Sequence, residues 1–155
     1  RLGRAWNALG QMRDSVRDWA GADRAYAQAL AVMPGSAMVL NNSGVSLMMQ
    51  GRHAEAEALF HQALAIEPGL AAAEGNLRLA LASQGRYDDA LAGVGKPQMP
   101  AALNNMGYVA MMRGDYGTAE GYLARALDLS PAYHGTAADN MVRLKAVQPE
   151  GATRK

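Results

Sequence analysis

Hydrophobic and polar positions recur along the chain at helical spacing, and one stretch is written almost twice. Residues 40–51 read LNNSGVSLMMQG, and residues 103–114 read LNNMGYVAMMRG. In both stretches, positions separated by four and then three residues (41, 45, 48 and 104, 108, 111) fall on one side of an α-helix. The pattern therefore predicts two equivalent helices, one in each half of the chain.

A weaker third copy divides the distance between them into repeats. Residues 76–85 read NLRLALASQG and close on Gly85. The interval from Gly51 to Gly85 equals that from Gly10 to Gly44, about 34 residues, a length typical of repeats built from two helices. The interval from Gly85 to Gly114 is shorter.

The halves that follow these stretches repeat too. Small, large and proline residues come in the same order: Ala22, Tyr26, Ala29, Leu30 and Pro34; Ala56, Phe60, Ala63, Leu64 and Pro68; Ala119, Leu123, Ala126, Leu127 and Pro131.

Each repeat is predicted to form two antiparallel helices that cross closely at small residues. These are Gly10, Gly44, Gly107, Ala22, Ala56 and Ala119. We expect an all-α chain without strands, and a single domain over residues 1–147. It would comprise repeats at about 3–36, 37–70, 71–99 and 100–133, a capping helix at about 136–147 and a flexible tail at 148–155.

Glycine and hydroxyl residues mark the expected helix ends. Gly51, Gly85 and Gly114 each precede a charged residue and are predicted to end the first helices. Ser36 and Thr136 are predicted to cap helix N-termini, and Asp139 follows Thr136 at the spacing of a capping box.

Two repeats depart from this pattern. Arg17 replaces the turn glycine in the first repeat, which predicts a different turn there. In the shortened third repeat, two glycines and two prolines lie between positions 93 and 100. Because such a density does not sustain a helix, we expect a short second helix and then an extended link.

The chain resembles the tetratricopeptide repeat family, whose signature W-x2-L-G-x2-Y…A-x3-F…P recurs with this same period. Trp6, Leu9 and Gly10 match its first half in the first repeat. The resemblance implies a right-handed superhelix, with first helices lining a concave groove. It implies structural roles for Trp6, Gly10, Ala22, Asn42, Gly44, Ala56, Phe60, Pro68, Asn105, Gly107, Ala119 and Pro131.

Alignment with the family places a partner-binding groove on Asn41, Val45, Met48, Met49, Leu79, Asn104, Tyr108, Met111 and Met112. Asn41 and Asn104 would bond the backbone of a bound peptide or helix. Asn42, Asn76 and Asn105 align with one another, and we interpret them as structural, bonding the adjoining helix. The methionines suit an adaptable apolar surface. Alternatively, they belong to the core.

Each short motif that resembles a catalytic or metal-binding site departs from the pattern that such a site requires. GVGKP at 93–97 lacks the first glycine and the Ser/Thr of a phosphate loop, and it reads as a linker. His53, Glu57 and His61 share a predicted helix without forming H-E-x-x-H, and they read as a solvated face. No Ser/His/Asp set is apparent. We therefore predict a protein that is not an enzyme and has neither cofactor nor metal.

Composition narrows the class of partner. Lys and Arg number 15 and Asp and Glu 14, so the basic excess typical of a nucleic-acid binder is missing. No run of eighteen apolar residues is present, and we expect no membrane span within this sequence. Cysteine is absent, which excludes disulfides and leaves the compartment open. A protein or peptide partner is the expectation that remains.

Within the family, QGRHAEAEALFHQALAIEPG and NLRLALASQGRYDDAL resemble the bacterial lipoproteins of tight-adherence (Flp) pilus assembly. This resemblance implies a periplasmic assembly factor, anchored to the outer membrane through a lipidated cysteine upstream. Its partner would be a pilus secretin or another component of the secretion machine. The alternatives are a general adaptor or co-chaperone, in the cytoplasm, and the regulatory module of a longer enzyme.

Overall fold

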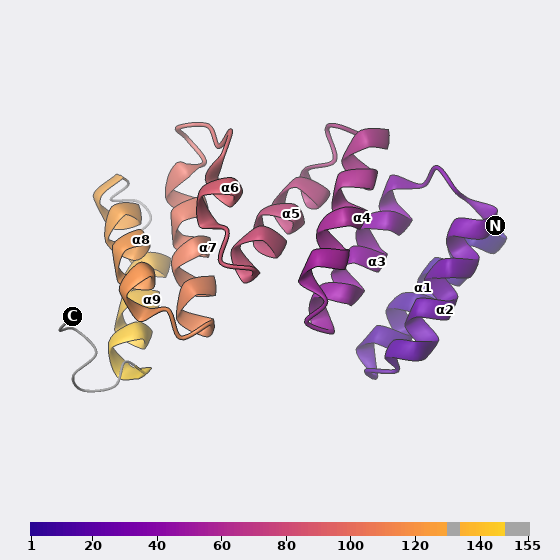
Figure 1. Cartoon of the computed structure of the whole chain (residues 1–155), viewed down its shortest axis with the longest axis horizontal. Helices are drawn as coiled ribbons and strands as arrows, with labels where there is room; N and C mark the ends of the chain where they lie inside the picture. Colours follow the sequence, from indigo (N-terminus) through magenta and orange to yellow (C-terminus); the bar gives the residue numbers. More distant parts are fainter. Residues whose placement is uncertain (130–133, 148–155) are drawn as a thin grey trace. The chain divides into compact units, whose positions relative to one another are not determined.

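The structure is a computed structural model that describes residues 1–129 and 134–147, and every regular element in them is an α-helix. The predicted all-α fold is therefore confirmed. The helices, labelled in Figure 1, are α1 (Leu2–Ser15), α2 (Trp19–Val32), α3 (Ala37–Met49), α4 (His53–Ile66), α5 (Ala71–Ser83), α6 (Tyr87–Leu91), α7 (Met99–Met112), α8 (Tyr116–Leu129) and α9 (His134–Val147). They follow the predicted order of four pairs and a capping helix.

The chain forms two compact units that divide inside the third repeat. Unit 1 comprises residues 1–84 and unit 2 comprises residues 85–155. In unit 1, α1 packs on α2 and α3 on α4, and α5 covers α4; in unit 2, α7 packs on α8 and α9 covers α8. The expectations of a single domain over 1–147 and of a right-handed superhelix stay predictions.

Both units bring the two helices of a pair together at a glycine. A methyl carbon on Gly44 would lie 2.6 Å from Cε1 of Phe60, whose side chain is fully buried. On Gly107 it would lie 2.6 Å from Cγ of Leu123. Gly10 stands in the same relation to Tyr26, at 2.7 Å from Cε1. The missing side chain makes room for the ring or the branched chain of the partner helix.

The turns between paired helices are alike, including the one predicted to differ. Gly51, Gly85 and Gly114 have positive φ angles of 76°, 81° and 78°. Arg17 adopts the same left-handed conformation at φ 57°, and its N–H donates to the carbonyl of Asp14 at 2.9 Å. The prediction of a different turn is wrong because the terminal hydrogen bonds of the helix impose this geometry, at a cost of about 1–2 kcal/mol for a residue with a Cβ.

The third repeat has the short second helix that its glycines and prolines predict. α6 has five residues, and its Tyr87 is buried with its ring centroid 5.6 Å from that of Tyr122 on α8. Residues 92–93 and 96–98 form turns, and the N–H of Val94 donates to the carbonyl of Leu91, so the prediction of an extended link is wrong. Pro100 lies in the first turn of α7, where the missing N–H of proline costs no hydrogen bond within the helix.

One of the two predicted N-caps is confirmed. The Ser36 hydroxyl accepts a bond from the N–H of Val39 at the start of α3. Thr136 does not cap α9, because that helix begins at His134 and Thr136 lies within its first turn. Pro131 and the predicted tail at 148–155 lie outside the described residues.

We predict opposite effects from adding one methyl group at two helical glycines. Gly44→Ala places it against the Phe60 ring, and overpacking of this kind costs about 1–3 kcal/mol of the free energy of unfolding. Gly75, on α5, is exposed with nothing within 4 Å of the added carbon, so Gly75→Ala should stabilise by about 0.4–1 kcal/mol. Urea unfolding measures both. Equal effects at the two sites would show that the crossing at Gly44 is not tight.

Candidate partner-binding face

The first helices of unit 1 are joined by asparagine side chains. Asn76 on α5 donates from Nδ2 to Oδ1 of Asn41 on α3 at 2.9 Å. On the other side of α3, Asn42 donates from Nδ2 to Oδ1 of Asn7 on α1 at 3.1 Å. Asn41 is buried and the other three are partly buried. Each amide therefore forms a hydrogen bond to a neighbouring helix in place of the bonds to water that it has lost.

Unit 2 uses the same device between α7 and α9. Nδ2 of Asn140 donates to Oδ1 of Asn104 at 2.9 Å, and both residues are buried. Asn105, the neighbour of Asn104, is exposed. The capping helix α9 is therefore bonded to α7 by an amide pair, as α5 is bonded to α3 in unit 1.

These bonds change the roles predicted for the asparagines. Asn41 and Asn104 were expected to meet a partner, but burial and hydrogen bonding to the next first helix give them a structural role. Asn105 was expected to be structural, and its exposure places it on the surface. Asn42 keeps the structural bond expected of it. Each donor stands slightly more than one repeat length after its acceptor, an offset that equal-spacing alignment does not reveal.

The apolar residues of the predicted groove differ widely in exposure. Met49, Tyr108 and Met112 are exposed at 54%, 41% and 69%, and are available to a partner. Val45, Met48 and Leu79 are partly buried, and Met48 packs against the cluster around Phe60. Met111 is buried, so it belongs to the core.

Val45 and Met49 come together in a hollow of about 280 Å³ on the first-helix side of unit 1, which we call the α1–α3 hollow. Its lining residues are Gln11, Asp14 and Ser15 from α1, Tyr26 from α2, and Asn42, Val45 and Met49 from α3. The prediction missed the four residues of α1 and α2. The sequence does contain a signal for Asp14, because this residue occupies the repeat position of Met48 and Met111, which were predicted to line the groove.

A carboxylate forms part of the wall of this hollow. Asp14 is only 8% exposed; its Oδ2 accepts a bond from the Tyr26 hydroxyl at 2.8 Å and its Oδ1 accepts one from the Ser46 hydroxyl at 2.6 Å. Burial raises the pKa of the Tyr26 phenol well above the usual range of a tyrosine, and the hydrogen bond to Asp14 and the negative charge of Asp14 raise it further. The phenol therefore stays protonated and remains a donor to the carboxylate.

The Ser46 hydroxyl extends this network toward the surface. Gln50 donates from Nε2 to Oγ of Ser46 at 3.3 Å and to Oδ1 of Asp23 at 3.1 Å. Arg52 pairs with Asp23 at 3.0 Å and with Glu55 at 2.7 Å. Arg52 thus forms ion pairs with carboxylates on the second helices α2 and α4, and it does not line the α1–α3 hollow.

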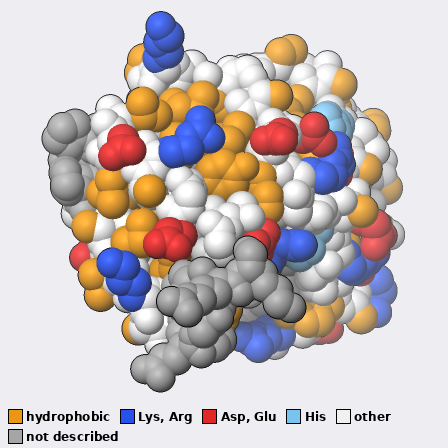
Figure 2. Space-filling view, turned by 60° about the vertical axis from the view of Figure 1, so that its left-hand side comes forward, with side chains coloured by type: hydrophobic (Ala, Val, Ile, Leu, Met, Phe, Trp, Pro, Cys, Tyr) orange, Lys and Arg blue, Asp and Glu red, His pale blue; other side chains and the backbone are white. Residues whose placement is uncertain are grey.

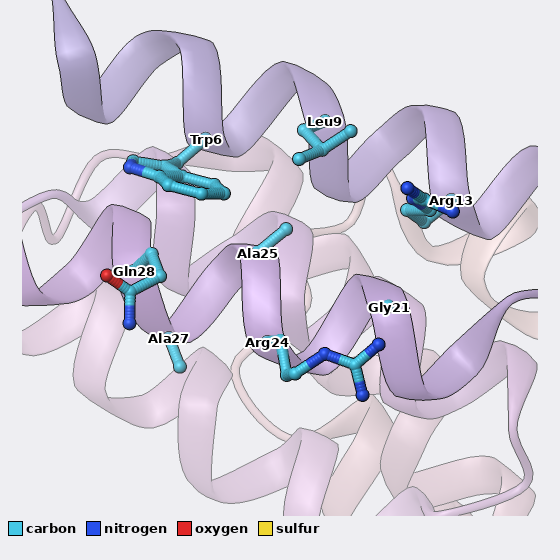
Figure 3. Close-up of a pocket in the computed structure, with 8 residues that line it drawn as sticks. All are labelled: Trp6, Leu9, Arg13, Gly21, Arg24, Ala25, Ala27 and Gln28. Atoms are coloured by element: carbon cyan, nitrogen blue, oxygen red, sulfur yellow. The ribbon is translucent and has the colours of Figure 1, made fainter.

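A second hollow, of about 400 Å³, opens between α1 and α2 (Figure 3). The ring of Trp6 lies between the two helices, and Leu9 and Arg13 follow along α1. In the second repeat the positions of Trp6 and Arg13 are taken by Leu40 and Leu47, which are buried. The face that is open in the first repeat is therefore buried at the equivalent positions of the second repeat. We attribute the shape of this hollow to the packing of the repeats.

The face shown in Figure 2 carries both hydrophobic and charged side chains. Hydrophobic side chains gather on the face that Figure 2 presents, and charged side chains of both signs lie scattered around them.

Within residues 1–129 and 134–147, no three His, Asp or Glu side chains are grouped as metal ligands. Nε2 of His61 lies 3.8 Å from Oε1 of Glu57, one turn apart on α4. No described helix combines the length and the apolar character needed to cross a membrane.

Comparison with known families agrees with this architecture. Family models described as tetratricopeptide repeat match residues 7–71, 47–106 and 101–134, which together cover most of the chain. Among proteins of curated function, none matches this sequence.

Solved structures share the fold over nearly the whole chain. The MamA protein is 18% identical, with 95% of this chain and 84% of that chain covered and a TM-score of 0.61. PilF of Pseudomonas aeruginosa is 24% identical, with 96% and 77% covered and a TM-score of 0.57. PilW, described as a widely conserved type IV pilus biogenesis factor, is 25% identical, with 97% and 80% covered and a TM-score of 0.61. These likenesses confirm an αα-solenoid.

We predict that two aligned asparagines contribute very differently to stability. Asn76→Ala removes the donor to buried Asn41 and leaves its oxygen unpaired, which should cost about 1–3 kcal/mol of the free energy of unfolding. Asn105→Ala, at the aligned exposed position, should stay within about 0.5 kcal/mol of the parent chain. Chemical unfolding of both variants compares them. A larger loss at Asn105 would contradict the structural assignment.

Proposed function

Because the chain belongs to the tetratricopeptide repeat family, we propose that it is a non-catalytic scaffold that binds a segment of another protein along its first helices. The family's fold is that of protein-interaction scaffolds. The observation that carries the proposal is the α1–α3 hollow, where exposed Met49 and partly buried Val45 form an apolar wall. At about 280 Å³, the hollow suits one or two side chains of a bound segment.

The chemistry of the face favours an adaptable contact. Methionine is flexible and polarizable, so Met49 can repack around different partner side chains. In unit 2, Tyr108 and Met112 occupy the repeat positions of Val45 and Met49 and are exposed. Tyrosine is often a hot spot of protein interfaces. We propose that Tyr108 and Met112 supply a second apolar contact to the partner, like that of Val45 and Met49.

We further propose that the partner belongs to a bacterial pilus machine of the tight-adherence (Flp) type. The role of PilW as a type IV pilus biogenesis factor supports this, at 25% identity over nearly the whole chain. So do the stretches QGRHAEAEALFHQALAIEPG and NLRLALASQGRYDDAL, which resemble the pilus lipoproteins. The proposed partner is the pilus secretin, and the proposed location is the periplasm, with a lipid anchor upstream of this sequence.

Binding of purified secretin, titrated by calorimetry, tests the proposal. The variant Val45→Ala with Met49→Ala removes the apolar wall of the hollow, and we expect secretin to bind at least about tenfold more weakly, a loss of about 1.4 kcal/mol. The matched control is Val32→Ala with Ile66→Ala, which truncates two exposed apolar residues at the ends of α2 and α4.

Each unfavourable outcome removes a different part of the proposal. Equal weakening by the two double variants, with both still folded, would exclude the first-helix face as the binding site. No binding of secretin to the parent chain would exclude the pilus partner, while leaving the face to be tested with another protein.

A further inference from the structure

The charge of Asp14 is met only by neutral groups in the α1–α3 hollow. Its two described hydrogen bonds come from the hydroxyls of Tyr26 and Ser46. A carboxylate offers about four lone-pair positions, so its oxygens can accept further bonds. The other lining residues are uncharged, and no lysine or arginine is among them.

The surrounding helices add negative potential at the same place. Gln11, Asp14 and Ser15 lie in the last turns of α1, and Met49 is the last residue of α3. The C-terminal end of a helix carries a partial negative charge and favours a cation nearby. Two such ends and a buried carboxylate therefore meet around one small cavity.

Nearby cations do not neutralise this site. Arg13, the neighbour of Asp14, lies on the other side of α1, where it pairs with Asp18 at 2.9 Å and lines the hollow of Figure 3. Arg17, in the turn after α1, is exposed and does not line the α1–α3 hollow. The excess of negative charge in the cavity is thus left for a ligand.

The repeat register shows that packing does not require this charge. Asp14 stands where the second repeat has Met48 and the fourth has Met111, so the same helix position accepts an apolar side chain. A buried carboxylate is costly unless it is compensated, and two hydroxyl bonds compensate less than a cation does.

We propose that the α1–α3 hollow binds a lysine or arginine side chain of the partner segment. The cationic head pairs with Asp14, and the methylene stem lies against Val45 and Met49, in the way long basic side chains cover apolar surface. This inference rests on the proposed scaffold function, and it names the residue type that this subsite selects.

A pair of small probes tests the inference without the natural partner. Nα-acetyl-lysine N-methylamide and Nα-acetyl-norleucine N-methylamide share a four-carbon stem and differ in the ammonium group. Each is titrated into the full chain while the methyl resonances of Met49 and Val45 are followed by NMR. We expect the lysine probe to shift both resonances saturably, at least about tenfold more tightly than the norleucine probe, because a charge-assisted bond forms only with the former.

The variant Asp14→Asn should weaken the lysine probe by at least about tenfold and leave the norleucine probe unchanged. Raising the salt concentration should weaken only the lysine probe, through screening. If Asp14→Asn fails to fold, the comparison of the two probes and its salt dependence in the parent chain still decide. Equal affinities for the two probes, or salt-independent lysine binding, would overturn the inference.

These outcomes separate the subsite from the scaffold function. Secretin binding that depends on Val45 and Met49, with no preference for the lysine probe, would refute the cationic subsite and leave the scaffold standing. A selective lysine probe, with secretin binding unaffected by the Val45 and Met49 truncations, would confirm the subsite and refute its use by this partner.

Discussion

An asparagine amide buried between two helices has lost its water, and a second polar group at the right place must replace it. Asn76 does this for Asn41 in unit 1, and Asn140 does it for Asn104 in unit 2. If one helix slides or rotates by a residue, both amides are left unpaired, at about 1–3 kcal/mol each. The amide pairs therefore fix the register of successive first helices, which apolar packing alone would fix less strictly.

This register decides which side chains remain available to a partner. Once Asn41 faces α5 and Asn42 faces α1, Val45 and Met49 are left on the wall of the hollow beside α1. The tight crossing at Gly10 brings the Tyr26 ring close to α1, and its hydroxyl reaches Asp14. The binding face is thus a consequence of how polar groups are satisfied inside the stack.

Local signals were sufficient to predict most of the fold. Helix periodicity, turn glycines such as Gly51 and the glycines and prolines after α6 each act over a few residues, so the sequence displays them directly. Arg17 was misjudged because hydrogen bonds at the end of α1 hold it in a conformation that its residue type disfavours.

The binding face was harder to predict because it depends on contacts between repeats. Asn41 and Asn104 look available when each helix is considered alone, and only the neighbouring helix shows that they are paired. Asp14 was missed although it occupies a methionine position of the other repeats. Its importance comes from Tyr26 and Ser46, which lie on other helices, distant from it in the sequence.

The claim that amide pairs hold the first helices is tested most directly by a double-mutant cycle on Asn41 and Asn76. The two single alanine variants and the double variant are unfolded in urea beside the parent chain. Paired amides predict a coupling free energy of about 0.5–3 kcal/mol, with the double variant less destabilised than the sum of the single variants. Additive losses, with no coupling between the two positions, would contradict the account.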